Sequence, residues 1–401
     1  MTDALLSDRR RIYAVSLLRS IGAGMAGPLL GLQLAAGNRD PAFLGLVVGT
    51  GLAGAAVAAW MITLGADRWG RRRSAALLCL LTAVGGFAVA WGGPEAFILA
   101  AAFFGMLNGM GKDRGALPVL ESVMLPNTVN AEGRTQVFAR YTALQDLGHG
   151  LGSLSICLPG LLVGFGLSQL NASSSCLALY AFLSLCALPL YLRLSPAMES
   201  EVRHDPPPLS PEGKATIRKL SLLFSLDAIG GGFLTSAGMT YIFAVHFHAT
   251  TTQIALLFVA ARLLNALSHL AAAWLAKKIG LVNTMVFTHI PSSLLLVTVA
   301  CTSSFPLAVV LFLLREGLVE MDVPTRQSYV VAVVAPHERS AAAGWTSLVR
   351  MGGWSLGAFL AAPLSAGGSI TAPLIAGASL KIFYDFALWS QCRKVKPPEE
   401  R

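Results

Sequence analysis

Charged side chains are scarce in this sequence of 401 residues. Only 13% of the residues are charged, 54% are hydrophobic and the mean hydropathy is +0.63, whereas soluble domains carry about 25% charged residues. This composition excludes a single soluble core. The formal net charge is +9, but the basic residues cluster between apolar runs and do not interleave with surface aromatic residues. We therefore expect no nucleic-acid partner and interpret the charge as a membrane-topology signal.

Motifs that carry catalytic or metal chemistry are missing as well. The six cysteines lie in or beside apolar runs, without the paired spacing that zinc or redox sites need. The sequence has no Gly-rich phosphate loop ending in Lys-Ser or Lys-Thr, so it lacks the ATP-binding motif that an ATP-driven pump needs. No loop holds the compact acid or metal cluster that an enzyme acting on a lipid-linked substrate needs. We expect no catalytic residue, no metal, no cofactor and no enzymatic activity.

Long apolar runs dominate what the sequence does contain. About 20 residues at 1.5 Å each cross the ~30 Å hydrocarbon layer of a bilayer, and about twelve such runs can be placed. They lie near residues 12–37, 42–65, 74–92, 95–120, 135–163, 174–193, 219–246, 252–276, 281–301, 306–327, 339–363 and 369–391. The sequence predicts an all-α membrane protein with twelve transmembrane helices.

Basic residues gather in alternate loops, among them Arg9 to Arg11, Arg68 to Arg73 and the tail from Arg393. The opposite loops hold almost none, apart from Arg39. By the positive-inside rule both termini are cytoplasmic. A polar, proline-rich connector divides the runs into two sets of six. We therefore predict a six-helix bundle over 1–194, a cytoplasmic linker over 195–218, and a second bundle with a cytoplasmic tail over 219–401.

The two halves repeat in sequence. Leu18–Gly24 matches Leu226–Gly232 about 208 positions later, and Arg114–Pro118 matches Glu320–Pro324. The offset stays nearly constant along the chain, so both halves have the same orientation in the membrane. Two parallel six-helix repeats are the layout of one class of transporters.

The loop between the second and third runs reads Asp67-Arg68-Trp69-Gly70-Arg71-Arg72-Arg73. With this loop, twelve spans and a central linker, the whole chain resembles the major facilitator superfamily, whose signature here is a Gly followed by Asp-Arg and Gly-Arg-Arg. The first glycine of that signature is Thr63 in this chain and its leucine is Gly65. The second-half run Asp322–Tyr329 is similar to a bacterial branch of the family.

The resemblance implies a monomeric transporter in the inner membrane of a bacterium, with a cytoplasmic gate in this loop. In the family the aspartate holds that gate against the second half, and the natural partner here is the start of the eleventh helix. We assign to the gate Asp67, Arg68, Gly70, Arg71, Arg72 and Arg339. The arginines can equally well serve topology and lipid headgroups.

Ionisable residues inside the spans form the second informative set, because each needs a partner or a function there. Arg19 and Asp227 occupy matching depths and either pair across the two halves or lie near the cytoplasmic rim. Lys381 and Asp385 are four residues apart and are expected to neutralise each other.

The fourth and tenth spans correspond under the repeat, and both are unusually polar, which is the best pointer to a transport site. Lys112 to Arg114 could alternatively mark the cytoplasmic end of the fourth helix, and Arg315 and Glu316 could form a purely structural pair. The predicted substrate or proton pathway comprises Arg19, Asp113, Arg114, Arg140, Asp227, Arg262, Arg315, Glu316, Glu320 and Arg350.

These features favour a secondary active transporter that moves a small solute by alternating access, coupled to protons, with efflux favoured over uptake. The many cationic side chains in the spans suggest an anionic or zwitterionic solute. Two alternatives stay open: a membrane-embedded enzyme on a lipid-linked substrate, and a non-transporting receptor that retains the fold. A sealed central cavity would favour the receptor, and an aqueous cavity lined by Arg315, Glu316 and Arg19 would favour transport.

Overall fold

The computed structural model describes residues 3–129, 134–199, 209–335, 338–366, 369 and 371–393, without the side chains at 67, 134–136, 139, 270, 331 and 340. The first half contains α1 (Asp3–Ala36), α2 (Pro41–Trp69), α3 (Arg71–Trp91), α4 (Glu95–Gly105), α5 (Leu117–Met124), α6 (Arg134–Leu154), α7 (Cys157–Gly164) and α8 (Gln169–Leu192). The second half contains α9 (Pro211–Gly232), α10 (Ser236–Val245), α11 (Thr251–Ile279), α12 (Leu281–Cys301), α13 (Phe305–Val319), α14 (Asp322–Ala332), α15 (Arg339–Ser365) and α16 (Thr371–Cys392).

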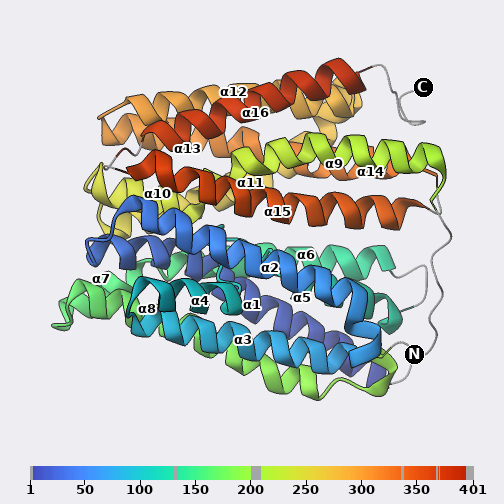
Figure 1. The fold of residues 1–401 in the computed structure, drawn as a ribbon, viewed down its shortest axis with the longest axis horizontal. Coiled ribbons are helices and arrows are strands. Elements are labelled where there is room, and N and C mark those ends of the chain that lie inside the picture. The colour runs from blue at the N-terminus through green and yellow to red at the C-terminus, as the bar shows by residue number, and fades with distance from the viewer. Residues whose placement is uncertain are drawn as a thin grey trace.

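These helices form twelve rods, six in each half, which confirms the predicted fold class. Four rods consist of two shorter helices in succession: α4 with α5, α6 with α7, α9 with α10, and α13 with α14. Among the described residues, eight segments are long and apolar enough to cross a membrane by themselves. The rods lie nearly parallel in two bundles, and the N and C termini lie at the same end of the molecule (Figure 1). We call that end the terminal side and the opposite end the far side.

Local sequence explains where several rods begin and end. The second rod of each half is joined to the third by a single glycine with positive φ, Gly70 at 90° and Gly280 at 86°, a conformation that only glycine adopts freely. The helix of the seventh rod begins at Pro211, inside the predicted linker. It extends this far because the side chain of Ser210 caps Gly213 N and proline is well tolerated in the first turn.

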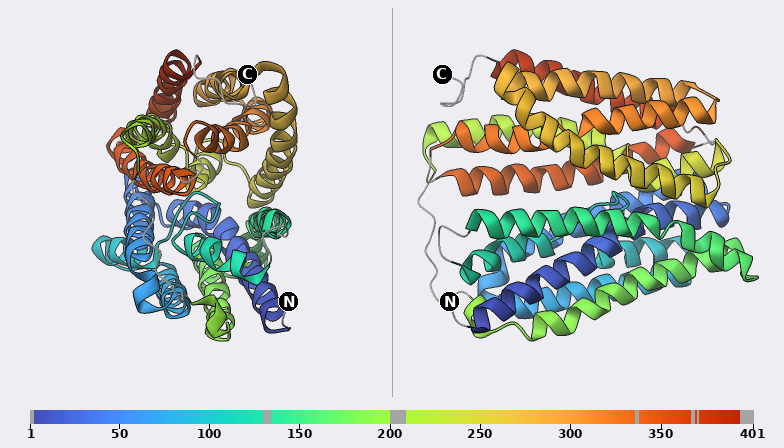
Figure 2. Two further views of the ribbon diagram at one scale, coloured as in Figure 1. Left: turned by 90° about the vertical axis from the view of Figure 1, so that its right-hand side faces the viewer. Right: turned by 180° about the vertical axis from the view of Figure 1, so that it is seen from behind.

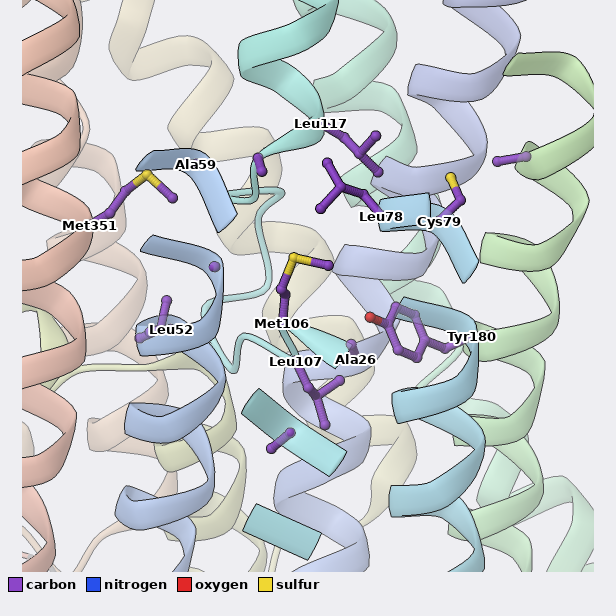
Figure 3. Packing of buried hydrophobic residues seen from close by; sticks show 14 of the residues in the cluster. Ala26, Leu52, Ala59, Leu78, Cys79, Met106, Leu107, Leu117, Tyr180 and Met351 are labelled. Carbon is purple, nitrogen blue, oxygen red and sulfur yellow. The ribbon is translucent and has the colours of Figure 1, made fainter. Parts of the chain in front are cut away.

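The first bundle packs around the rods α1 to α3. Figure 3 shows Met106 and Leu107, which follow α4, inserted beside Ala26 and Tyr180, while Met351 of α15 reaches toward Ala59 of α2. Because Met351 belongs to α15 and the other residues named belong to the first bundle, this cluster joins the first bundle to α15 of the second.

The two halves contact each other closely on the far side. A Cβ atom on Gly45 would lie 2.9 Å from the carbonyl oxygen of Ala358, and one on Gly31 would lie 2.4 Å from that of Ala237. The hydroxyl of Ser355 donates to the carbonyl of Gly49 at 2.8 Å. The view along the rods shows the two bundles lying next to each other (Figure 2). The closest described backbone contacts between the halves thus lie on the far side.

Candidate functional site

A polar cavity of about 870 Å³ lies between the two halves. Its walls come from α6 and the segment after α4 in the first half, and from α9, α11, α14 and α15 in the second. A smaller cavity of about 120 Å³ adjoins it. The two cavities share Lys112, Arg114, Glu320, Val323, Arg350 and Trp354 as wall residues. Charged residues of both halves therefore line a shared central region.

Most of the predicted pathway residues line these cavities, namely Asp113, Arg114, Asp227, Arg262, Arg315, Glu316, Glu320 and Arg350. Arg19 lies apart, beside a smaller space with Asp113 and Tyr180. Arg140 was misplaced in the pathway, because its side chain is exposed and lines neither central cavity. His289 and Arg326 also line these cavities and were not predicted from the sequence.

The segment 106–116 interrupts the fourth rod, and the second half holds its backbone. Three successive carbonyl oxygens accept hydrogen bonds from that half: Gly109 from Ala237 N at 2.9 Å, Met110 from the Ser236 hydroxyl at 2.8 Å, and Gly111 from Arg262 at 2.9 Å. Non-helical backbone at membrane depth needs such partners. Because α5 continues beyond the break, the reading that the fourth helix ends at the cytoplasm at Lys112 to Arg114 was wrong.

The interrupted fourth and tenth rods meet at one ion pair between the halves. Lys112 Nζ lies 2.8 Å from the carboxylate of Glu320, which follows α13. One helical turn before Glu320, Glu316 pairs with Arg315 and accepts a hydrogen bond from Asn265 at 3.1 Å. The two repeat-related breaks therefore place their charges together at the centre of the molecule.

Asp227 is the centre of a buried charge cluster in the second half. Its carboxylate, 4% exposed, lies 2.7 Å from Lys381 Nζ and 2.7 Å from an Arg350 nitrogen. Arg326 lies 3.7 Å away and also pairs with Asp322. Three cations therefore surround this one carboxylate.

The predicted pairing of Arg19 with Asp227 was wrong. Arg19 is buried and bridges Glu121 at 2.7 Å and Asp113 at 3.1 Å, both in its own half. The hydroxyls of Tyr141 and Tyr191 also donate to Glu121, at 2.5 and 2.6 Å. Since the repeat gives Arg19 and Asp227 equivalent positions in separate bundles, each finds its partners within its own bundle.

The expected pairing of Lys381 with Asp385 was also wrong, because His289 lies between these two side chains. His289 Nδ1 lies 2.9 Å from Asp385, and His289 Nε2 lies 3.2 Å from Lys381 Nζ. The chain Asp385, His289, Lys381, Asp227 joins α12, α16 and α9 in a buried interior. A lone ionisable residue in the apolar run 281–301 was the signal that could have identified His289.

The side chain of Asp67, the main gate residue, lies outside the described part of the chain. Of the other gate residues, Arg68 and Arg339 are exposed and Arg71 is buried. The backbone N–H groups of Arg71 and Arg72 donate to Glu199 at 2.6 and 3.3 Å. At the start of α15, Glu338 accepts from Ser210 N at 2.7 Å. These described contacts involve the linker ends, and the gate assignment stays a prediction.

A comparison with family models identifies the family. A family model described as Major Facilitator Superfamily matches residues 12–358. An uncharacterised membrane protein of Saccharomyces cerevisiae is 24% identical over 369 residues, 82% of each chain.

Solved structures of transporters share the fold across nearly the whole chain. The nucleoside transporter NupG superposes with a TM-score of 0.73 at 14% identity, covering 97% of this chain and 99% of that one. The xylose transporter XylE from E. coli, in a partially occluded inward-open conformation, gives 0.72 at 12% identity and covers 100% of both chains. At these identities the likeness establishes the fold alone.

Proposed function

Because the chain belongs to the major facilitator superfamily, we propose that it is a secondary active transporter that moves a small solute across a membrane by alternating access. The observation that carries this proposal is the charged cavity of about 870 Å³ between two repeated bundles that are closed against each other on the far side. With the basic, terminal side in the cytoplasm, the conformation is the one that exchanges solute with the cytoplasm.

The contacts between the halves suit a rocking movement of one bundle against the other. On the far side they are backbone approaches at Gly31 and Gly45 and the contact of Gly49 with the ring of Phe359. At the centre they are the hydrogen bonds to segment 106–116 and the ion pair between Lys112 and Glu320. A solute bound among these central charges would interact differently with them in the two arrangements of the bundles. It would therefore shift the equilibrium toward one arrangement.

We assign proton coupling to His289 and Asp385. Asp227, Glu320 and Asp113 each have a cation within 3.1 Å, whereas the carboxylate of Asp385 faces an imidazole. In a neutral His289, Nδ1–H donates to Asp385 and Nε2 accepts from Lys381. Protonation puts a second N–H against the ammonium group, so Lys381 must move and its bond to Asp227 weakens. Proton binding at His289 would thereby change the contacts among α9, α12 and α16 beside the cavity.

Replacement of His289 by Gln and of Asp385 by Asn should uncouple flux from the proton gradient. In proteoliposomes under an imposed pH gradient, we expect gradient-driven uptake of a solute that stabilises the purified protein to fall roughly tenfold or more. Exchange of labelled for unlabelled solute without a gradient should persist. Arg140→Gln, which changes an exposed residue of α6, is the control, and Glu316→Gln tests the alternative carboxylate. Wild-type gradient-driven flux in both the His289 and Asp385 variants would refute the assignment.

The same experiment addresses direction and the competing functions. We retain efflux as the favoured direction, to be compared in liposomes of opposite pH gradient. An open central cavity supports transport over a sealed receptor, and its walls include Arg315 and Glu316 as the transport hypothesis required, although Arg19 is absent from them. Flux in neither direction would leave the receptor as the better explanation.

A further inference from the structure

Two cationic side chains of the central cavities have no carboxylate partner among the described residues: Arg114 and Arg262. Every other cation that lines them is paired. Lys112 pairs with Glu320, Arg315 with Glu316, Arg326 with Asp322, and both Arg350 and Lys381 with Asp227. The described ion pairs therefore leave two half-buried positive charges beside the cavities without a counter-charge.

Arg114 is fixed by an aromatic ring. Its guanidinium carbon lies 3.9 Å from the centre of a ring of Trp354, and Arg350 lies 4.9 Å from the same residue's ring. The Nε atom of Arg114 is buried and has no hydrogen-bond partner. Stacking occupies the face of a guanidinium and leaves its edge of N–H donors available for a planar anion.

Arg262 approaches the same space from α11 in the other half. One of its terminal nitrogens donates to the Gly111 carbonyl at 2.9 Å, and its Nε is also buried without a partner. Gly111 permits this approach, because a Cβ atom there would lie 2.9 Å from the Arg262 nitrogen. Arg114 and Arg262 both line the smaller cavity of about 120 Å³.

The rest of this smaller cavity includes an apolar wall. Its members are Met110, Leu234, Met239, Phe258 and Phe312. Phe258 and Phe312 pack against each other with ring centres 6.2 Å apart. A wall of this kind suits the hydrocarbon or aromatic body of a ligand, and the few polar groups fix its orientation.

We propose that Arg114 and Arg262 form the binding site for the anionic group of a small organic anion, whose apolar body rests against Phe258 and Phe312. The inference rests on the proposed function and names its substrate class. A carboxylate or phosphate matches the guanidinium N–H groups that the described hydrogen bonds leave unused. Such an anion would also supply the counter-charge that these two arginines lack. Because Arg114 belongs to the first half and Arg262 to the second, its binding would draw the halves together.

The test is ligand-induced thermal stabilisation of the purified protein in detergent, with a matched panel of probes. Benzoate and phenyl phosphate carry the charge, benzamide has the shape of benzoate without it, and benzylamine carries the opposite charge. We expect the anions to raise the melting temperature and the other two probes to leave it unchanged. Arg114→Gln and Arg262→Gln should each weaken anion binding roughly tenfold or more. Arg140→Gln should bind as the wild type does.

Arg114→Lys keeps the charge but loses the planar guanidinium group, and it should also bind the anions more weakly. This variant keeps the test decisive if Arg114→Gln fails to fold. The proposal is overturned if no anion of the panel stabilises the protein, if benzamide does so equally, or if both arginine variants keep wild-type affinity. Binding needs no flux, so its failure is separate from failure of transport. Selective anion binding without flux in liposomes would uphold the site and reject the transporter.

Discussion

Asp227→Ala should give the largest loss of stability of any single charge removal in this protein. The substitution leaves Lys381 and Arg350, each 2.7 Å from the carboxylate, without their buried counter-charge. Removing one partner of a buried ion pair typically costs about 3–5 kcal/mol, because the remaining charge stays desolvated. We expect a markedly lower melting temperature in detergent, little monodisperse protein on size-exclusion chromatography, and no flux.

Glu95→Ala is the control for this experiment. Glu95 is an exposed carboxylate that pairs with Arg39 at 3.4 Å, and an exposed pair contributes about 0–1 kcal/mol. Adding Lys381→Met to Asp227→Ala should recover part of the stability, since one stranded cation is removed with its partner. If Asp227→Ala unfolds at the same temperature as Glu95→Ala, the cluster around Asp227 is not what holds α9 to α15 and α16.

Gly357→Val should disrupt the second bundle as strongly. A Cβ atom on Gly357 would lie 2.0 Å from the carbonyl oxygen of Ile229, so α15 and α9 touch backbone to backbone. Neither main chain can yield as a flexible side chain could, and we expect a cost of roughly 3 kcal/mol or more. The measurement is the yield of folded protein and its melting temperature.

The repeat and the same helix supply the controls. Gly152 makes the equivalent contact in the first half, where its Cβ would lie 2.1 Å from the Ile21 oxygen, so Gly152→Val should behave alike. Gly352 has no atom within 4 Å of such a Cβ. Gly352→Ala should leave stability unchanged or raise it, because alanine favours the helix. Equal behaviour of Gly357→Val and Gly352→Ala would contradict the close crossing.

The sequence by itself determined the architecture. Twelve apolar runs became twelve rods because the length of a run and the thickness of a bilayer are local quantities. The repeat related Arg114 in the fourth span to Glu320 in the tenth, and the structure joins the two interrupted rods through Lys112 and Glu320. The turn between α2 and α3 has a similarly local cause, because glycine adopts the φ of 90° found at Gly70 freely.

Only the tertiary structure decided which charges meet. Arg19, Asp227, Lys381 and Asp385 were each recognised as ionisable groups that need partners, yet each has a different partner from the one expected. Spacing along one helix limits only neighbours on that helix, whereas partners on other helices depend on how each rod is rotated and where it crosses the next. Close contacts such as Gly357 on Ile229 set those rotations, and so they also decide that Arg114 and Arg262 face one cavity without a counter-charge.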